Sequence, residues 1–290
     1  MKRMKEEMVK RADRLNALLQ GSGVRVEYVE KNHGNQLIDA YMVKYNDSKV
    51  IPSVSYAPRW YDLPDEEVAA YLEELGKKEV SVDLDKYMDP EYVRSHVYPL
   101  MIGASCREQV ERGNFLYRLR DDFLIMYYVE VKIQNGPGPD SLEDGTLKLT
   151  YPVFRMTGLS EEELHTLAFE NMARQTEVIL LSDALRGIFE PDTDTQVLPV
   201  YVVTGRDREY GAAGILCSSV YRQLSAAFGE KFVVLPSSLH ECLAVSLADV
   251  EDPLFYTMMV QEVNHEAVRK EEWLADHAYI YDGRNMTRIE

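Results

Sequence analysis

The chain has 290 residues, of which 46% are hydrophobic and 10% aromatic, as in folded rather than disordered proteins. Its 49 acidic residues outnumber its 32 basic ones, and the formal net charge of −17 disfavours nucleic-acid and membrane partners, which need clustered Lys and Arg. The N-terminus lacks a signal-peptide core, and no run approaches the roughly 18 apolar residues of a membrane span. With three widely spaced cysteines, we expect a cytoplasmic protein with free thiols.

The first 112 residues predict helices around a small antiparallel meander. Apolar residues recur at three- and four-residue steps in the helical segments, and apolar and polar residues alternate in the strands. Pro52 favours an edge position for the third strand, because proline cannot donate a ladder hydrogen bond. We expect helices at 3–20, 62–75 and 104–112, and strands at 24–30, 37–45 and 51–56.

The middle of the chain predicts a hairpin. Residues 123–131 are apolar almost throughout, which is typical of a strand buried on both faces. Glycine and proline at 134–145 predict the loop at the hairpin tip, and 147–154 predicts the return strand.

Two helices are expected after this hairpin. Ser160 and Glu163 have the spacing of a capping box, in which each side chain bonds the backbone N–H of the other residue. The apolar stretch 178–188 predicts a further helix centred on residues 181–185.

From residue 197 onward the predicted order is β-α-β-β-α-β-β. A sheet with helices packed on one face would bury the apolar sides of these elements. The predicted fold class is therefore α+β, with mixed, mainly antiparallel sheets. We expect an N-terminal lobe at 1–112 and a C-terminal lobe at 113–290, or one continuous domain. The C-terminal elements are expected at 197–204, 212–228, 232–235, 242–247, 254–268, 278–281 and 286–289.

The hexapeptide 236–241 is the most chemically suggestive stretch, because Ser237, Ser238, His240 and Glu241 are the residue types of a hydrolase triad. A triad needs a base within about 3 Å of the hydroxyl and an acid behind the imidazole. The alternative is a turn between two strands, in which the serines bond the backbone. These residues are candidates, and no catalytic residue is assigned.

The stretch 204–211 leads from a strand toward a helix, and a helix N-terminus can bind an anion. Arg206, Arg208 and Gly211 are therefore candidate ligand-binding residues, and a plain connecting loop is the alternative. The stretch lacks the Lys-Ser/Thr pair of a Walker A loop and the pattern G-x-G-x-x-G.

Two Glu-x-x-His pairs, at 162–165 and 262–265, place a carboxylate and an imidazole on one helix face. A di-iron centre also needs glutamates from two further helices, and the predicted strands leave no room for that bundle. We therefore predict no metal site and leave the cofactor open. Asn264 is a further candidate for ligand binding, with a helix-capping role as the alternative.

Several motifs together resemble an uncharacterised domain-of-unknown-function family of proteins from Gram-positive gut anaerobes. The most specific are Leu235–Glu241 (LPSSLHE), Val260–Asn264 (VQEVN) and Asp276–Asp282 (DHAYIYD), joined by Tyr210–Ala213 (YGAA). The resemblance covers most of the chain and implies an intracellular bacterial protein. It implies no activity and no catalytic residue.

These features together favour a non-catalytic binding or regulatory module with a small-molecule or protein partner near residues 205–211 and 236–241. One alternative is a hydrolase that uses Ser237 or Ser238 with His240. The other is an acidic protein-interaction module. The sequence leaves the oligomeric state open.

Overall fold

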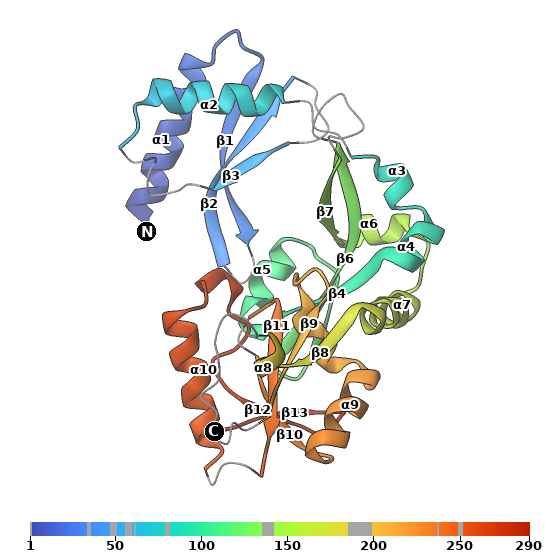
Figure 1. Ribbon diagram of the computed structural model, residues 1–290. Coiled ribbons are helices and arrows are strands. Elements are labelled where there is room, and N and C mark those ends of the chain that lie inside the picture. The colour runs from blue at the N-terminus through green and yellow to red at the C-terminus, as the bar shows by residue number, and fades with distance from the viewer. Residues whose placement is uncertain are drawn as a thin grey trace. The chain divides into compact units, whose positions relative to one another are not determined.

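The computed structural model describes residues 2–33, 36–46, 51–55, 60, 62–78, 82–134, 142–184, 199–236, 238–248 and 252–290. The chain forms two compact units, whose elements are labelled in Figure 1. Unit 1 contains Met1–Leu84 and Val131–Gly145, and unit 2 contains Asp85–Glu130 and Thr146–Glu290. These boundaries differ from the lobes expected from the sequence, which divide the chain at residue 112. The independent folding of 1–112 therefore stays a prediction.

Unit 1 contains the predicted meander, a three-stranded antiparallel sheet of order β1-β2-β3. Strand β3 is at the edge, as Pro52 predicts. Leu15, Tyr41 and Leu72 are fully buried in one core between the helices and the sheet. The elements are α1 (Lys2–Leu18), β1 (Val24–His33), β2 (Gln36–Tyr45), β3 (Ser53–Ser55) and α2 (Asp65–Lys77).

Unit 2 begins with short helices and a sheet in which β4 and β5 flank β6. Strand β7 also pairs with β6, and the stretch Val131–Gly145 of these two strands and their connection belongs to unit 1. All seven residues of β4 are buried, although this strand was not predicted. Pro99 is tolerated because β4 is an edge strand. The elements are α3 (Leu84–Tyr87), α4 (Pro90–His96), β4 (Val97–Gly103), η2 (Ala104–Cys106), α5 (Arg107–Arg112), β5 (Tyr117–Arg120), β6 (Phe123–Gln134), β7 (Leu142–Lys148) and α6 (Tyr151–Met156).

The predicted return strand at 147–154 was wrong in its second half. Strand β7 ends at Lys148, and helix α6 starts at Tyr151. Thr150 caps this helix by accepting the Val153 N–H, and Pro152 suits a first helical turn, where its missing N–H costs no hydrogen bond. Of the predicted loop, residues 135–141 lie outside the described residues.

The capping box before α7 (Glu161–Gln175) is half formed. The Ser160 hydroxyl accepts the Glu163 N–H at 3.2 Å, but the Glu163 carboxylate pairs with Arg94 at 2.6 Å. The helix predicted at 178–188 is partly wrong, because β8 (Thr176–Leu180) precedes the short α8 (Leu181–Ala184). Strand β8 forms because it pairs with β9, a contact that local periodicity does not reveal. Residues 185–188 lie outside the described part.

The C-terminal part of unit 2 forms a six-stranded antiparallel sheet of order β13-β12-β10-β11-β9-β8. The element order confirms the predicted α+β class and its β-α-β-β-α-β-β unit. The elements are β9 (Val200–Gly205), η4 (Gly211–Leu216), α9 (Ser218–Phe228), β10 (Phe232–Leu235), β11 (Glu241–Ser246), α10 (Leu254–Glu266), η5 (Lys270–Glu272), β12 (Tyr279–Tyr281) and β13 (Met286–Arg288).

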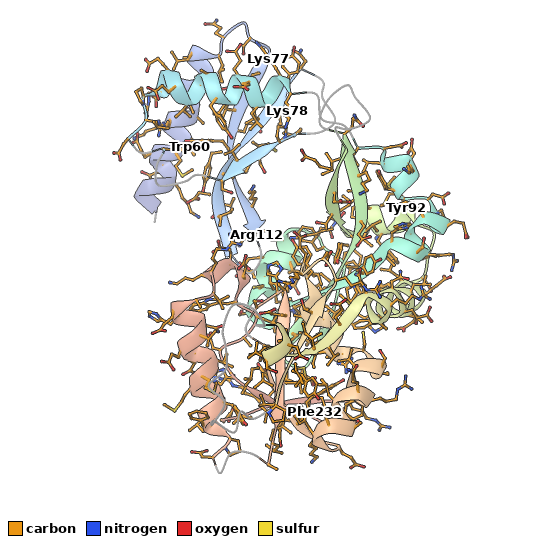
Figure 2. All side chains as sticks on the ribbon, viewed as in Figure 1. Trp60, Lys77, Lys78, Tyr92, Arg112 and Phe232 are labelled. Carbon is orange, nitrogen blue, oxygen red and sulfur yellow. The ribbon has the colours of Figure 1, made fainter. Side chains whose placement is uncertain are left out.

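Helices cover both faces of this sheet rather than one. Phe232, labelled in Figure 2, lies on one face of the sheet. Its ring packs against Tyr221 and Phe228 of α9. Val233 on the other face packs with Val260 of α10. Both faces need a cover because all four residues of β10 are apolar and buried. Within the described ranges, no helix combines the length and the apolar composition needed to cross a membrane.

Candidate functional site

The two candidate loops of the sequence, 205–211 and 236–241, lie against each other at one end of the six-stranded sheet. The Ala212 N–H donates to the Leu239 carbonyl at 3.3 Å. A Cβ on Gly211 would lie 2.7 Å from the carbonyl oxygen of His240, so this approach requires glycine. Tyr210 is held in a left-handed conformation with φ of 48°, which an aromatic residue rarely adopts. The contact therefore brings Tyr210 beside His240.

Both ring nitrogens of His240 face protein groups. Nδ1 accepts the backbone N–H of Tyr210 at 3.3 Å, so it carries no proton. Nε2 lies 3.6 Å from the carboxylate of Glu272. The ring also stacks on Tyr210, with centroids 5.7 Å apart. These contacts fix the orientation of the imidazole and occupy the lone pair that a general base would need.

Tyrosines continue this cluster into the four-stranded sheet. The Tyr210 ring is 5.4 Å from Tyr128, which stacks on Tyr98 at 5.7 Å. Burial raises the pKa of Tyr98 to about 12, and burial also raises the pKa values of Tyr128 and Tyr210. The three phenols therefore stay protonated at neutral pH and supply no phenolate. The sequence analysis did not connect these tyrosines with His240, because they are far apart in the chain.

The described candidates for hydrolysis make structural contacts. The Ser238 hydroxyl accepts the backbone N–H of His240 at 3.1 Å, as in the turn alternative, and no bond to the imidazole is present among the described residues. Glu241 is exposed at the start of β11, opposite Thr204. Ser237 lies outside the described residues.

The geometry behind the anion-binding expectation is not present at the 205–211 turn. Gly211 opens the short 3₁₀ helix η4, and α9 begins only at Ser218. Arg206 has its guanidinium 3.8 Å from Glu177 and is highly exposed. Arg208 is exposed and also left-handed, with φ of 59°. The turn thus presents two arginines to solvent without the helix terminus that would orient an anion.

Asn264 lies on the inner side of α10 and is 1% exposed. Its Nδ2 donates to the Ala275 carbonyl at 2.8 Å and to Asp276 at 3.2 Å. Its Oδ1 is buried without a hydrogen-bond partner among the described residues. Asn264 therefore anchors the segment after α10.

The two Glu-x-x-His pairs do not converge. His165 contacts the Tyr127 hydroxyl at 2.8 Å, and Glu162 pairs with Arg118 at 2.9 Å. Glu262 and His265 are exposed on α10. Across the residues that the structure describes, no group of three or more His, Cys, Asp or Glu side chains could hold a metal ion.

A pocket of about 480 Å³ lies in unit 1, at the end of α2. Its lining includes Tyr71, Leu75 and two lysines, Lys77 and Lys78 (Figure 2). Both lysines are exposed, and Lys77 is paired with Glu73 on the same helix. None of the side chains that line the pocket is a buried polar group that could orient a ligand. We therefore do not regard this pocket as a specific binding site.

The outer face of α10 is an apolar surface that the sequence analysis missed. We use "outer face" for five side chains of α10 that are 36–62% exposed, while the opposite side of the helix packs on the sheet (Figure 1). A surface helix normally turns polar residues outward, so apolar residues on both sides are unusual. The sequence contains a sign of this second apolar side. The run LFYTMMV is apolar at more positions than a single buried stripe requires. The five residues are Leu254, Phe255, Met258, Met259 and Val263.

Comparison with known proteins gives a family. No curated protein and no solved structure matches the chain. A family model described as a family of unknown function, DUF5688, matches residues 1–283. This match confirms the expected resemblance to a domain of unknown function, and the chain belongs to the DUF5688 family.

Proposed function

We propose that the chain is a non-catalytic protein-binding module that holds its partner on the outer face of α10. The observation that carries this proposal is the exposure of five large apolar side chains on one helix, with Met258 62% and Phe255 52% exposed. Contiguous apolar patches on a protein surface are typical of interaction sites. None of the five belongs to the core that α10 shares with the sheet, so their exposed apolar surface adds nothing to that core.

The contacts of His240 support the non-catalytic part of the proposal. A general base must direct a lone pair at the proton that it removes. The lone pair of His240 is already an acceptor for the Tyr210 N–H, and Ser238 is engaged by the backbone. In this arrangement the hexapeptide joins two strands and ties the 205–211 turn to η5.

The binding proposal can be tested with a phage-displayed library of 16-residue peptides selected on the immobilised full chain. We expect the selected peptides to carry apolar residues at helical spacing and to lose binding to the Phe255→Gln/Met258→Gln variant. Glutamine keeps helix propensity while it removes apolar surface. The matched control is Leu119→Gln/Met156→Gln, which changes two side chains of unit 2 that are 56% and 55% exposed. Peptides that bind both variants equally would contradict the proposal.

The catalytic alternative has its own test, a panel of p-nitrophenyl esters and chromogenic amides. We expect no hydrolysis that depends on His240. An activity that the wild-type chain shows and His240→Ala abolishes would overturn the non-catalytic assignment.

A further inference from the structure

We infer that the partner of the outer face is a basic amphipathic helix, that is, a helix with one apolar face flanked by Lys or Arg. This inference rests on the proposed function and specifies the chemistry of its partner. Three features of α10 support it: the geometry of its exposed rows, the position of its acidic residues and its short length.

The exposed side chains form two rows along the helix. One row runs through Leu254, Met258 and Glu262, and the other through Phe255, Met259 and Val263, with steps of four residues in each. Rows at this spacing form the ridges and grooves into which a second helix packs. Two of the five apolar residues are methionines, whose flexible side chains adapt to different helical partners. The outer face therefore has the side-chain spacing and the apolar composition of a helix-binding surface.

The acidic residues of α10 favour a partner helix that carries basic residues. Glu262 continues the first row, Glu266 follows it one turn later, and both are exposed. The helix contains no Lys or Arg, and its one basic residue is His265 in the last turn. The negative end of the helix dipole lies at the same end as the two glutamates. Beyond the helix, Arg269 is paired with Glu272, and Lys270 is exposed. A helix with basic residues beside its apolar face complements this distribution.

A second copy of the chain fits this surface less well. It would bring a net charge of −17 to a face that already carries two exposed glutamates. A helix of 13 residues is about 20 Å long, and its face is well short of the roughly 800 Å² per partner of a stable dimer. A short amphipathic helix that binds at micromolar affinity needs no larger interface.

The inference can be tested with two synthetic 18-residue peptides that share one apolar pattern of leucines, one with Lys and one with Glu at all polar positions. Fluorescence anisotropy with the full chain measures the affinity of each. We expect the Lys peptide to bind at least about tenfold more tightly than the Glu peptide. Its affinity should fall at least about fivefold between 50 and 500 mM salt, because salt screens the attraction between opposite charges.

Two variants separate the apolar contribution from the charge. Phe255→Gln/Met258→Gln should weaken the Lys peptide at least tenfold, whereas Leu119→Gln/Met156→Gln should leave it unchanged. Glu262→Lys/Glu266→Lys should weaken the Lys peptide at least fivefold and strengthen the Glu peptide. Circular dichroism and the fluorescence of Trp273, which lies just beyond α10, show whether each variant is folded.

The outcomes distinguish the partner chemistry from the proposed function. If both peptides bind equally and Phe255→Gln/Met258→Gln weakens both, the basic partner is overturned while the binding function stands. If that variant changes neither peptide, or if neither peptide binds the folded wild-type chain, both are overturned. A dimer in sedimentation velocity that Phe255→Gln/Met258→Gln dissociates would show that a second copy occupies the face, which also overturns the basic partner.

Discussion

Helices α9 and α10 cover opposite faces of one sheet, yet their outward sides differ. Helix α9 buries Val220 and Leu224 and exposes polar or small residues, among them Arg222 and Gln223. Helix α10 buries Tyr256 and Val260, but it exposes the five apolar side chains of the outer face. The two helices have 11 and 13 residues, so their length does not explain the difference.

The comparison separates what the fold requires from what it does not. The sheet requires one apolar stripe from each helix, and α9 supplies that and nothing more. The second apolar side of α10 is only partly buried and keeps the rest of its apolar surface in water, at a cost of about 25 cal/mol for each Å². Under the proposed function, a partner that binds the outer face accounts for these apolar residues.

The largest expected effect is on the inner side of α9. Leu224 is fully buried, so Leu224→Ala should destabilise unit 2 by about 2–5 kcal/mol through lost burial and a residual cavity. Urea unfolding followed by Trp273 fluorescence in a Trp60→Phe background measures this, because the chain has two tryptophans and Trp273 is the one in unit 2. The exposed neighbour Gln223→Ala is the control and should change stability by less than about 0.5 kcal/mol. If Leu224→Ala and Gln223→Ala lowered the free energy of unfolding equally, the buried and exposed sides of α9 would not differ in their contribution to stability.

The inner side of α10 should behave in the same way with a smaller loss. Val260 is 2% exposed and packs with Val233 and Tyr256, so Val260→Ala should cost about 2 kcal/mol for the methyl groups and the cavity. The same Trp273 measurement applies. A cost below about 0.5 kcal/mol would mean that α10 does not depend on its contact with the sheet.

Asn264 tests whether an inner polar residue anchors α10. Asn264→Ala removes the hydrogen bonds donated to Ala275 and Asp276. It also removes a buried Oδ1 that has no hydrogen-bond partner among the described residues, and these effects partly cancel. We therefore expect a loss of about 1 kcal/mol, with peptide binding at the outer face unchanged. The exposed Gln261→Ala serves as control. Lost peptide binding in an otherwise stable Asn264→Ala variant would restore the ligand-binding role predicted from the sequence.

The smallest effect concerns His165, the histidine of the first Glu-x-x-His pair. Burial, with the nearby Arg118, lowers the pKa of His165 below its ordinary 6.5. The unfolded chain therefore binds more protons below about pH 6.5, so stability present above that pH is lost as the pH falls through the folded pKa. His165→Gln should flatten this acid dependence, which urea midpoints between pH 5 and 8 would show. The control is the exposed Gln223→Ala, which removes no titratable group and should leave the acid dependence unchanged. An acid dependence that His165→Gln does not flatten would contradict the assignment.

The sequence predicted elements whose signals are local. The Asp282-Gly283 turn is present between β12 and β13, with Asp282 accepting the N–H groups of Arg284 and Asn285 and Gly283 at φ of 86°. Helix α1 and the meander of unit 1 also follow from periodicity. By contrast, β4 contains a proline and β8 precedes a helical turn, and both are strands because of partners distant in the chain.

The candidate site was predicted only in part. The meeting of the 205–211 and 236–241 loops was anticipated as a shared surface, but the contacts of His240 with Tyr210 and Glu272 depend on long-range geometry. The outer face was readable in principle, since Leu254 and Met258, like Phe255 and Met259, are four residues apart on one helix. It was overlooked because periodicity was used to find one buried stripe, whereas α10 has apolar residues on both sides.

The most direct test of the account is the free energy of unfolding of unit 2 in the Phe255→Gln/Met258→Gln variant, measured through Trp273 in the Trp60→Phe background. If the outer face exists for a partner, removing its apolar side chains should change the stability by less than about 0.5 kcal/mol, as for ordinary surface positions. A loss of about 2 kcal/mol or more, comparable with Val260→Ala, would show that these residues belong to the core of the fold and would contradict the central claim.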